Sequence, residues 1–216
     1  GKCLTKMARS GYVADMTLHR LAIFFFLSVF SSAVTLASAQ DRSAHDRLAR
    51  DIYEQLVNIN TSPAAGTTRA AEAMAQRLLD AGVPATDVRV LGAQPDQHNL
   101  VARLRGNPSA RPVLLLAHLD VVEARKEDWS VDPFAFLEKD GYFYGRGTTD
   151  DKAQAAIWIA TLIRLKQEGV VPNRDLIVAL TADEEGGGPA NGVSWLLKNH
   201  RDLIDAEYCL NEGGGG

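Results

Sequence analysis

The sequence predicts an α/β fold in which a mostly parallel sheet is flanked by helices. Two observations support this prediction. Apolar runs typical of buried strands alternate with segments of helical periodicity, and polar motifs directly follow three of those runs. The composition suits one sizeable core, because 46% of the 216 residues are hydrophobic and 23% are charged.

Residues 1–39 differ in composition from the rest and are predicted to be an upstream segment followed by a signal peptide. Residues 21–39 are apolar and end in Ala37-Ser38-Ala39, the small-x-small pattern that signal peptidases cut. We therefore expect cleavage after Ala39 and a secreted or periplasmic domain over residues 40–216, without stable membrane association. The alternative is an uncleaved membrane anchor, since about 20 apolar residues can span a bilayer.

Two helices are predicted next. Residues 46–60 indicate an amphipathic helix, because apolar side chains recur at spacings of three and four. These are Leu48, Ile52, Leu56 and Ile59. Thr67 or Thr68 can cap a second helix, which should end at Gly82.

The rest of the chain alternates between strand and helix patterns. Strands are predicted at residues 87–92, 99–106, 111–119, 174–182 and 206–212, and helices at residues 152–168 and 191–200. The third and fourth strand patterns are apolar almost throughout, as expected for strands covered on both faces. The helix at 152–168 is apolar nearly all round, so we expect it to be deeply buried.

The charge and cysteine content exclude some classes of function. The net charge is −4, and residues 1–39 hold four basic residues and one acidic residue, so the predicted mature chain is more acidic still. An acidic chain gains no electrostatic attraction from the phosphate backbone of a nucleic acid, so we expect no nucleic-acid partner. Cys3 lies outside the predicted mature chain, so Cys209 can form no intrachain disulfide and is expected to be a small core residue.

Three of the predicted strands end in polar motifs. His118 and Asp120 lie at the end of the third, and Glu184 and Glu185 follow the fourth. Glu212 ends the fifth. Ligands of open α/β sheets collect beyond the carboxyl ends of the strands, so these side chains are expected to share one cleft.

Asp150 and Asp151 add two carboxylates to this set. Carboxylates that share a cleft raise each other's pKa, so the cluster is tolerable only if cations compensate it. An imidazole with carboxylates and no thiolate suits zinc, with Co²⁺ or Mn²⁺ as substitutes. Two metals about 3.5–4 Å apart, bridged by one carboxylate and a water, are the arrangement that uses this many acids for hydrolysis.

Roles follow from the positions of the side chains. Neighbouring side chains on a strand diverge, so Glu185 is predicted to bind metal while Glu184 faces the water as general base. Asp120 lies on the same strand face as His118 and can accept the other N–H of the imidazole, which fixes its tautomer. Each motif alone has an ordinary alternative: a core histidine, solvated glutamates, a helix N-terminus or a loop. The joint pattern carries the prediction.

The motifs LLLAHLDVV, WSVDPF, YGRGTTDDK, TADEEGG and NEGG occur in this order. From about Asp41 to Gly216 the chain thereby resembles the di-zinc aminoacylase / carboxypeptidase G / succinyl-diaminopimelate desuccinylase family of metallopeptidases. The resemblance implies a zinc-peptidase catalytic domain that hydrolyses amide bonds in small peptides or N-acyl amino acids.

Carried over by residue, the resemblance implies two zinc ions. His118 binds one zinc and Asp150 bridges both, and the peptide bond after Asp150 is cis. Glu185 and Glu212 are further ligands. Glu184 is the base, and Asp120 orients His118.

The chain also departs from this family. Family members carry a further zinc-binding histidine downstream and a lid and dimerisation domain, and His200 is a poor stand-in for that histidine. We therefore expect residues 40–216 to be the truncated N-terminal part of the catalytic domain, inactive alone, from a protein that forms homodimers. The alternative is a non-catalytic metal-binding or peptide-binding relative, against which Glu184 argues, since binding alone needs no base beside a metal.

Overall fold

A computed structural model of the protein describes residues 44–213. The chain divides into two units at residue 46, and the described part of the first unit, residues 44–46, is helical. The predicted signal peptide and its cleavage site lie outside the described residues. Within the described range, no helix combines the length and apolar character needed to cross a membrane. Export and homodimer formation therefore stay predictions.

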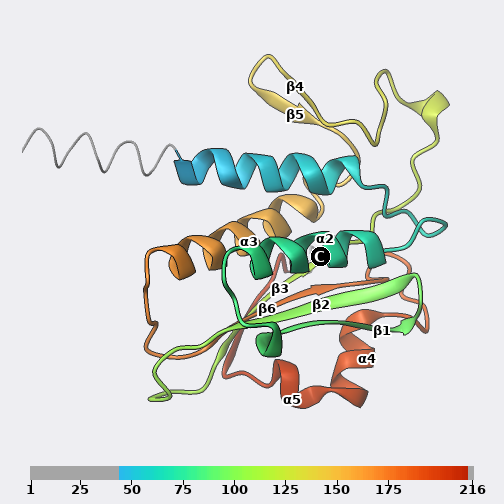
Figure 1. The fold of residues 1–216 in the computed structure, drawn as a ribbon. Helices are drawn as coiled ribbons and strands as arrows, with labels where there is room; N and C mark the ends of the chain where they lie inside the picture. Colours follow the sequence, from blue (N-terminus) through green and yellow to red (C-terminus); the bar gives the residue numbers. More distant parts are fainter. Residues whose placement is uncertain (1–43, 214–216) are drawn as a thin grey trace, which may run out of the picture. The chain divides into compact units, whose positions relative to one another are not determined.

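The second unit is built on a five-stranded sheet with the order β1-β2-β6-β3-β7 (Figure 1). The strands are β1 (Val88–Gln94), β2 (Gln97–Leu104), β3 (Val113–His118), β6 (Leu176–Thr181) and β7 (Tyr208–Leu210). β3 is parallel to both of its neighbours, β6 and β7. β2 alone runs the other way and is antiparallel to β1 and β6. The mostly parallel α/β fold predicted from the sequence is thus confirmed.

The reversed strand follows from a tight turn. β1 and β2 are joined only by Pro95 and Asp96, and Gln94 is paired with Gln97. A two-residue connection can join antiparallel strands only, whereas a parallel pair needs a long crossover. β1 and β2 therefore form a hairpin, while the connection between β3 and β6 contains helix α3 (Lys152–Gln167).

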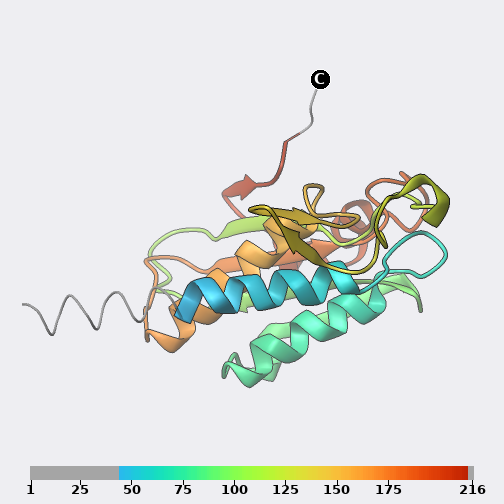
Figure 2. The same ribbon diagram turned by 90° about the horizontal axis from the view of Figure 1, so that it is seen from above.

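Helices cover both faces of the sheet (Figure 1). One face carries residues 47–58 of the first helix, together with α2 (Thr68–Asp80) and α3 (Lys152–Gln167). The first helix lies next to α2 (Figure 2), and the Arg77 guanidinium donates to the Asp51 carbonyl at 3.2 Å. The opposite face is covered by α4 (Gly192–Asn199) and α5 (Arg201–Ile204). Two 3₁₀ turns, Ala85–Asp87 and Lys126–Asp128, complete the helical elements.

A small hairpin that the sequence patterns did not predict lies outside the main sheet. It consists of β4 (Leu137–Lys139) and β5 (Tyr142–Tyr144). Aromatic side chains attach it to the first helix: the Tyr53 ring meets the rings of Phe136 and Phe143 edge to face, at centroid distances of 5.4 Å. Three-residue strands are too short to show an alternating pattern, and packing on Tyr53 stabilises them instead.

Three smaller predictions were wrong in whole or in part. Cys209 is exposed rather than buried, because it lies on β7, an edge strand whose residues are all exposed. Thr67 is the N-cap residue of α2, as predicted, but the side chains of Thr67 and Thr68 form no cap bond; their hydroxyls donate to the carbonyls of His98 and Pro95, both at 2.8 Å. α3 is not buried all round, since Ile157 is 53% exposed.

Candidate functional site

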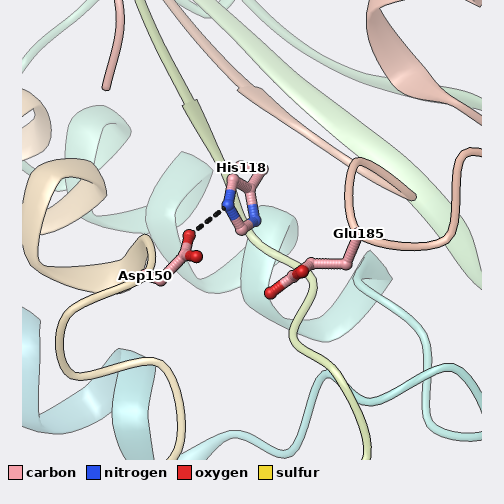
Figure 3. A group of neighbouring side chains, drawn as sticks. All are labelled: His118, Asp150 and Glu185. Carbon is pink, nitrogen blue, oxygen red and sulfur yellow. Dashed lines mark hydrogen bonds and ion pairs between the residues drawn. The ribbon is translucent and has the colours of Figure 1, made fainter. Parts of the chain in front are cut away.

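The site is centred on His118, the last residue of β3. The imidazole is 2% exposed, and its Nε2 lies 2.7 Å from Oδ1 of Asp150 (Figure 3). Its Nδ1 lies 3.0 Å from the backbone carbonyl of Asp120. Because that carbonyl can only accept, Nδ1 carries the proton in this contact and Nε2 is directed at the acidic groups. The end of a buried strand thus presents one ring nitrogen to the cleft.

The predicted carboxylates meet around this nitrogen. Oε1 of Glu212 lies 3.6 Å from Nε2 of His118, and Oε2 of Glu184 lies 3.9 Å from it. The Glu185 carboxylate extends toward the same space (Figure 3). His118, Asp150 and Glu185 form a group whose possible ligand atoms all lie within 4.8 Å of one another. The structure therefore brings the predicted metal ligands together, although their roles stay predictions.

Asp151 lies among the possible metal ligands, although the sequence did not predict it to be one. It forms a second group of possible ligands with His118 and Glu212. Its Oδ2 already accepts a hydrogen bond from the His118 backbone N–H at 3.2 Å. The peptide bond between Asp150 and Asp151 is cis, as the family resemblance implied. Asp150 has the freer carboxylate of the two, since 60% of its side chain is exposed while Asp151 is buried.

Asp120 contacts His118 differently from the prediction. Its carboxylate Oδ1 lies 3.6 Å from Nδ1, beyond hydrogen-bond distance, and the backbone carbonyl of the same residue is the closer acceptor. The reason is that Asp120 lies beyond the end of β3, where its Oδ2 accepts the Glu185 amide at 3.0 Å. Asp120 therefore connects His118 to the loop that carries Glu184 and Glu185.

The loop after β6 is held by a residue that the sequence reasoning missed. Asn99 is fully buried; its Oδ1 accepts the Ala182 amide at 2.9 Å, and its Nδ2 donates to the Leu91 carbonyl at 3.0 Å. The first contact satisfies the backbone amide that directly follows β6, so Asn99 helps to determine how the chain leaves β6 toward Glu184. A buried amide in an otherwise apolar run was the only sequence signal.

Lys152, the first residue of α3, was also missed. It is fully buried, and its Nζ donates to the Ile59 carbonyl at 2.8 Å. Burial lowers the pKa of its amine to about 7. An apolar helix pattern gave no reason to expect a lysine in the core.

The electrostatics of the cleft favour a cation. Burial opposes protonation of His118, but the carboxylates of Asp120 and Asp150 outweigh it and raise the pKa of the imidazole to about 10. Burial raises the pKa of Asp151 to about 7. Burial followed by repulsion from neighbouring carboxylates also raises the pKa of Glu185 and Glu212. These acids repel one another, so a positive charge in the cleft is favourable.

The donor set fits a divalent metal ion. One imidazole nitrogen and several carboxylate oxygens converge, a combination that suits zinc. Oδ1 of Asp120 is buried beside His118 without a hydrogen-bond partner. A buried carboxylate oxygen without a partner is costly unless a positive charge lies near it.

Comparison with known proteins gives three results. Residues 114–216 match the sequence profile of Peptidase family M20/M25/M40. Human N-fatty-acyl-amino acid synthase/hydrolase PM20D1 is 40% identical over 109 residues, which are 50% of this chain and 21% of that protein. Aminoacylase-1 of Sus scrofa is 37% identical over 108 residues, 50% of this chain and 26% of that protein. The matched stretch thus spans about a fifth to a quarter of the length of these relatives.

Solved structures share the fold. Human carnosine dipeptidase 1 has a TM-score of 0.64 at 21% identity, over 82% of this chain and 41% of that one. The M20 family metallo-carboxypeptidase Sso-CP2 from Sulfolobus solfataricus has a TM-score of 0.63 at 18% identity, over 77% of this chain and 37% of that one. At these identities the likeness establishes the fold alone.

Proposed function

From the match of residues 114–216 to peptidase family M20/M25/M40, we propose that the chain belongs to this family and forms part of the catalytic domain of a metal-dependent hydrolase. Its substrates are amide bonds in small peptides or N-acyl amino acids. The observation that carries the proposal is the convergence of His118, Asp150 and Glu185, from a strand end, a helix start and a loop, on one small volume. The names of the relatives, a fatty-acyl-amino acid hydrolase and an aminoacylase, support the acyl-amino acid class.

Two zinc ions fit the proposed site, with Co²⁺ or Mn²⁺ as substitutes. His118, Asp150, Glu185 and Glu212 would hold them. When bound, zinc lowers the pKa of water and polarises the carbonyl of the scissile bond. We retain Asp150 rather than Asp151 as the shared ligand, because one oxygen of Asp151 is engaged by the backbone of β3.

The protein's own groups have distinct tasks in this proposal. The Asp120 carbonyl holds Nδ1 of His118, so that Nε2 faces the cleft. Glu184 is 48% exposed and lies 3.9 Å from Nε2, so its carboxylate can reach water that enters the cleft. It accepts a proton from the attacking water and returns it to the leaving amine. The Asp120 carboxylate keeps the loop that carries this base against the end of β3 through the Glu185 amide.

The test is Glu184→Gln in the full-length protein. This change keeps the size of the side chain but removes its ability to accept a proton at neutral pH. We expect metal content to stay at the wild-type value while hydrolysis of N-acyl amino acids and dipeptides falls by about 10²- to 10⁴-fold. Glu72→Gln on the exposed side of α2 is the matched control and should leave both quantities unchanged.

Either of two results would contradict this proposal. Unchanged hydrolysis in Glu184→Gln would remove the base assignment. A wild-type protein that binds zinc but cleaves no substrate of either class would instead favour the non-catalytic metal-binding or peptide-binding relative.

A further inference from the structure

The two edges of β3 are paired unequally. β6 pairs with β3 over its whole length, from Val113 to His118. β7 pairs only with Val113–Leu115. Beyond Leu115, the β7 edge of β3 therefore has no strand partner among residues 44–213.

Two backbone groups on that edge need partners. In a strand, the N–H and C=O groups of alternate residues point to the same edge. The Leu119 amide donates toward β6, to the Thr181 carbonyl at 2.8 Å. Residues 116 and 118 therefore face the other edge, where the Leu116 carbonyl and the His118 amide lie beyond the reach of β7.

Side chains of α3 and of its N-cap residue, Asp151, take the place of the missing strand. Nε2 of Gln154 donates to the Leu116 carbonyl at 2.9 Å, and Nε1 of Trp158 donates to the same oxygen at 3.3 Å. Oδ2 of Asp151 accepts the His118 amide at 3.2 Å. These three residues follow at spacings of three and four, so they lie on one side of the helix.

These contacts join the two elements that carry the site. Asp150 comes directly before α3, and His118 ends β3 (Figure 3). The Leu116 carbonyl, which lies two residues before His118, accepts two hydrogen bonds from side chains of α3, so both of its lone pairs are engaged. A shift of α3 along β3 would therefore break these bonds and change the separation of Nε2 of His118 and Oδ1 of Asp150.

We propose that Gln154, assisted by Trp158, is a positioning residue for the metal site: it holds the start of α3 in register with the end of β3. This inference rests on the proposed function, since it assigns a task toward the same ions. The hydrogen bond of Gln154 goes to the Leu116 backbone carbonyl, so Gln154 acts through the backbone. It is half-buried, so its replacement leaves the core intact.

The test compares Gln154→Met with Asn199→Leu in the full-length protein. Both changes remove a side-chain amide that donates to a backbone carbonyl at 2.9 Å, but Asn199 donates to Trp195 on α4. Zn²⁺ and Co²⁺ affinity is measured by competition with a chromophoric chelator, and thermal midpoints are measured on the metal-free proteins. We expect Gln154→Met to weaken metal binding roughly tenfold, and Asn199→Leu to leave it unchanged.

Trp158→Phe provides a second variant, which keeps an aromatic ring but removes the weaker donor. We expect a smaller loss of affinity than in Gln154→Met, and the largest loss in the double variant. If Gln154→Met lowers the thermal midpoint but binds both metals as tightly as wild type, its role is structural and the inference is overturned. If wild type itself binds neither metal, the proposed function fails instead.

Discussion

The sharpest stability prediction concerns Gly192→Ala at the start of α4. The φ angle of Gly192 is not in the left-handed region, so alanine fits the backbone and only the added methyl group matters. That Cβ would lie 1.9 Å from Oδ1 of Asn99 and 2.8 Å from the Ala182 nitrogen. Asn99 is fully buried and bonded at both ends of its amide, so it cannot move aside without breaking a contact.

The expected cost combines three effects. Loss of the bond between Asn99 and the Ala182 amide leaves buried polar groups unpaired, which costs about 1–3 kcal/mol. Overpacking of a buried site costs a further ~1–3 kcal/mol. Replacement of glycine by alanine lowers the conformational entropy of the unfolded chain, which stabilises the folded protein by about 0.4–1 kcal/mol. The net destabilisation should be about 3 kcal/mol, which corresponds to a thermal midpoint lower by roughly 10 °C for a domain of this size.

Urea denaturation of the full-length protein measures this cost, with Ser194→Ala on the exposed side of the same helix as the control. The control should change the free energy of unfolding by less than about 0.5 kcal/mol. A double-mutant cycle identifies the cause, because Asn99→Ala makes room for the new methyl group. In that background Gly192→Ala should cost at least about 1 kcal/mol less. An equal cost in both backgrounds would refute the clash.

Two other outcomes are expected. A chelator should lower the thermal midpoint of the holoprotein, because the clustered carboxylates lose their compensating charge, and re-added zinc should restore the midpoint. Calorimetry with and without chelator measures this change. An unchanged midpoint would argue against a structural contribution of the metal. Burial raises the pKa of Asp175, but the Gly106 amide and the Arg103 guanidinium outweigh it and hold that pKa below its usual value. The resulting stability is present above the unfolded pKa of about 3.9 and is lost as pH falls through the folded pKa. Urea titrations between about pH 3 and 7 should therefore show a shallower acid decline for Asp175→Asn than for wild type.

Much of the fold could be predicted because its signals are local. The runs that became β3 and β6 are apolar almost throughout, and both strands lie inside the sheet with helices on each face. Parallel strands of this kind place their carboxyl ends together, so the polar residues that follow them were expected to meet. His118, Glu184 and Glu212 do lie close together in the structure.

Other features depended on neighbours that the sequence does not reveal. Cys209 has an apolar environment in the sequence, yet it is exposed because β7 forms the edge of the sheet. The hydroxyl of Thr67 has a helix to cap but bonds to the β2 backbone, which folds beside it. Lys152 follows the two aspartates as a surface lysine would, yet it is buried against the end of the first helix.

The residue types at the strand ends could be read from the amino-acid sequence, and they predicted the α/β class and the candidate ligand set. Hydrophobic periodicity and motif order are properties of short segments, so they can be read without coordinates. Which carboxylate oxygen faces Nε2 of His118, and which helix completes the open edge of β3, could be learned from the folded chain alone. Those contacts join residues such as His118 and Asp151, 33 positions apart, and their geometry depends on how whole elements pack together.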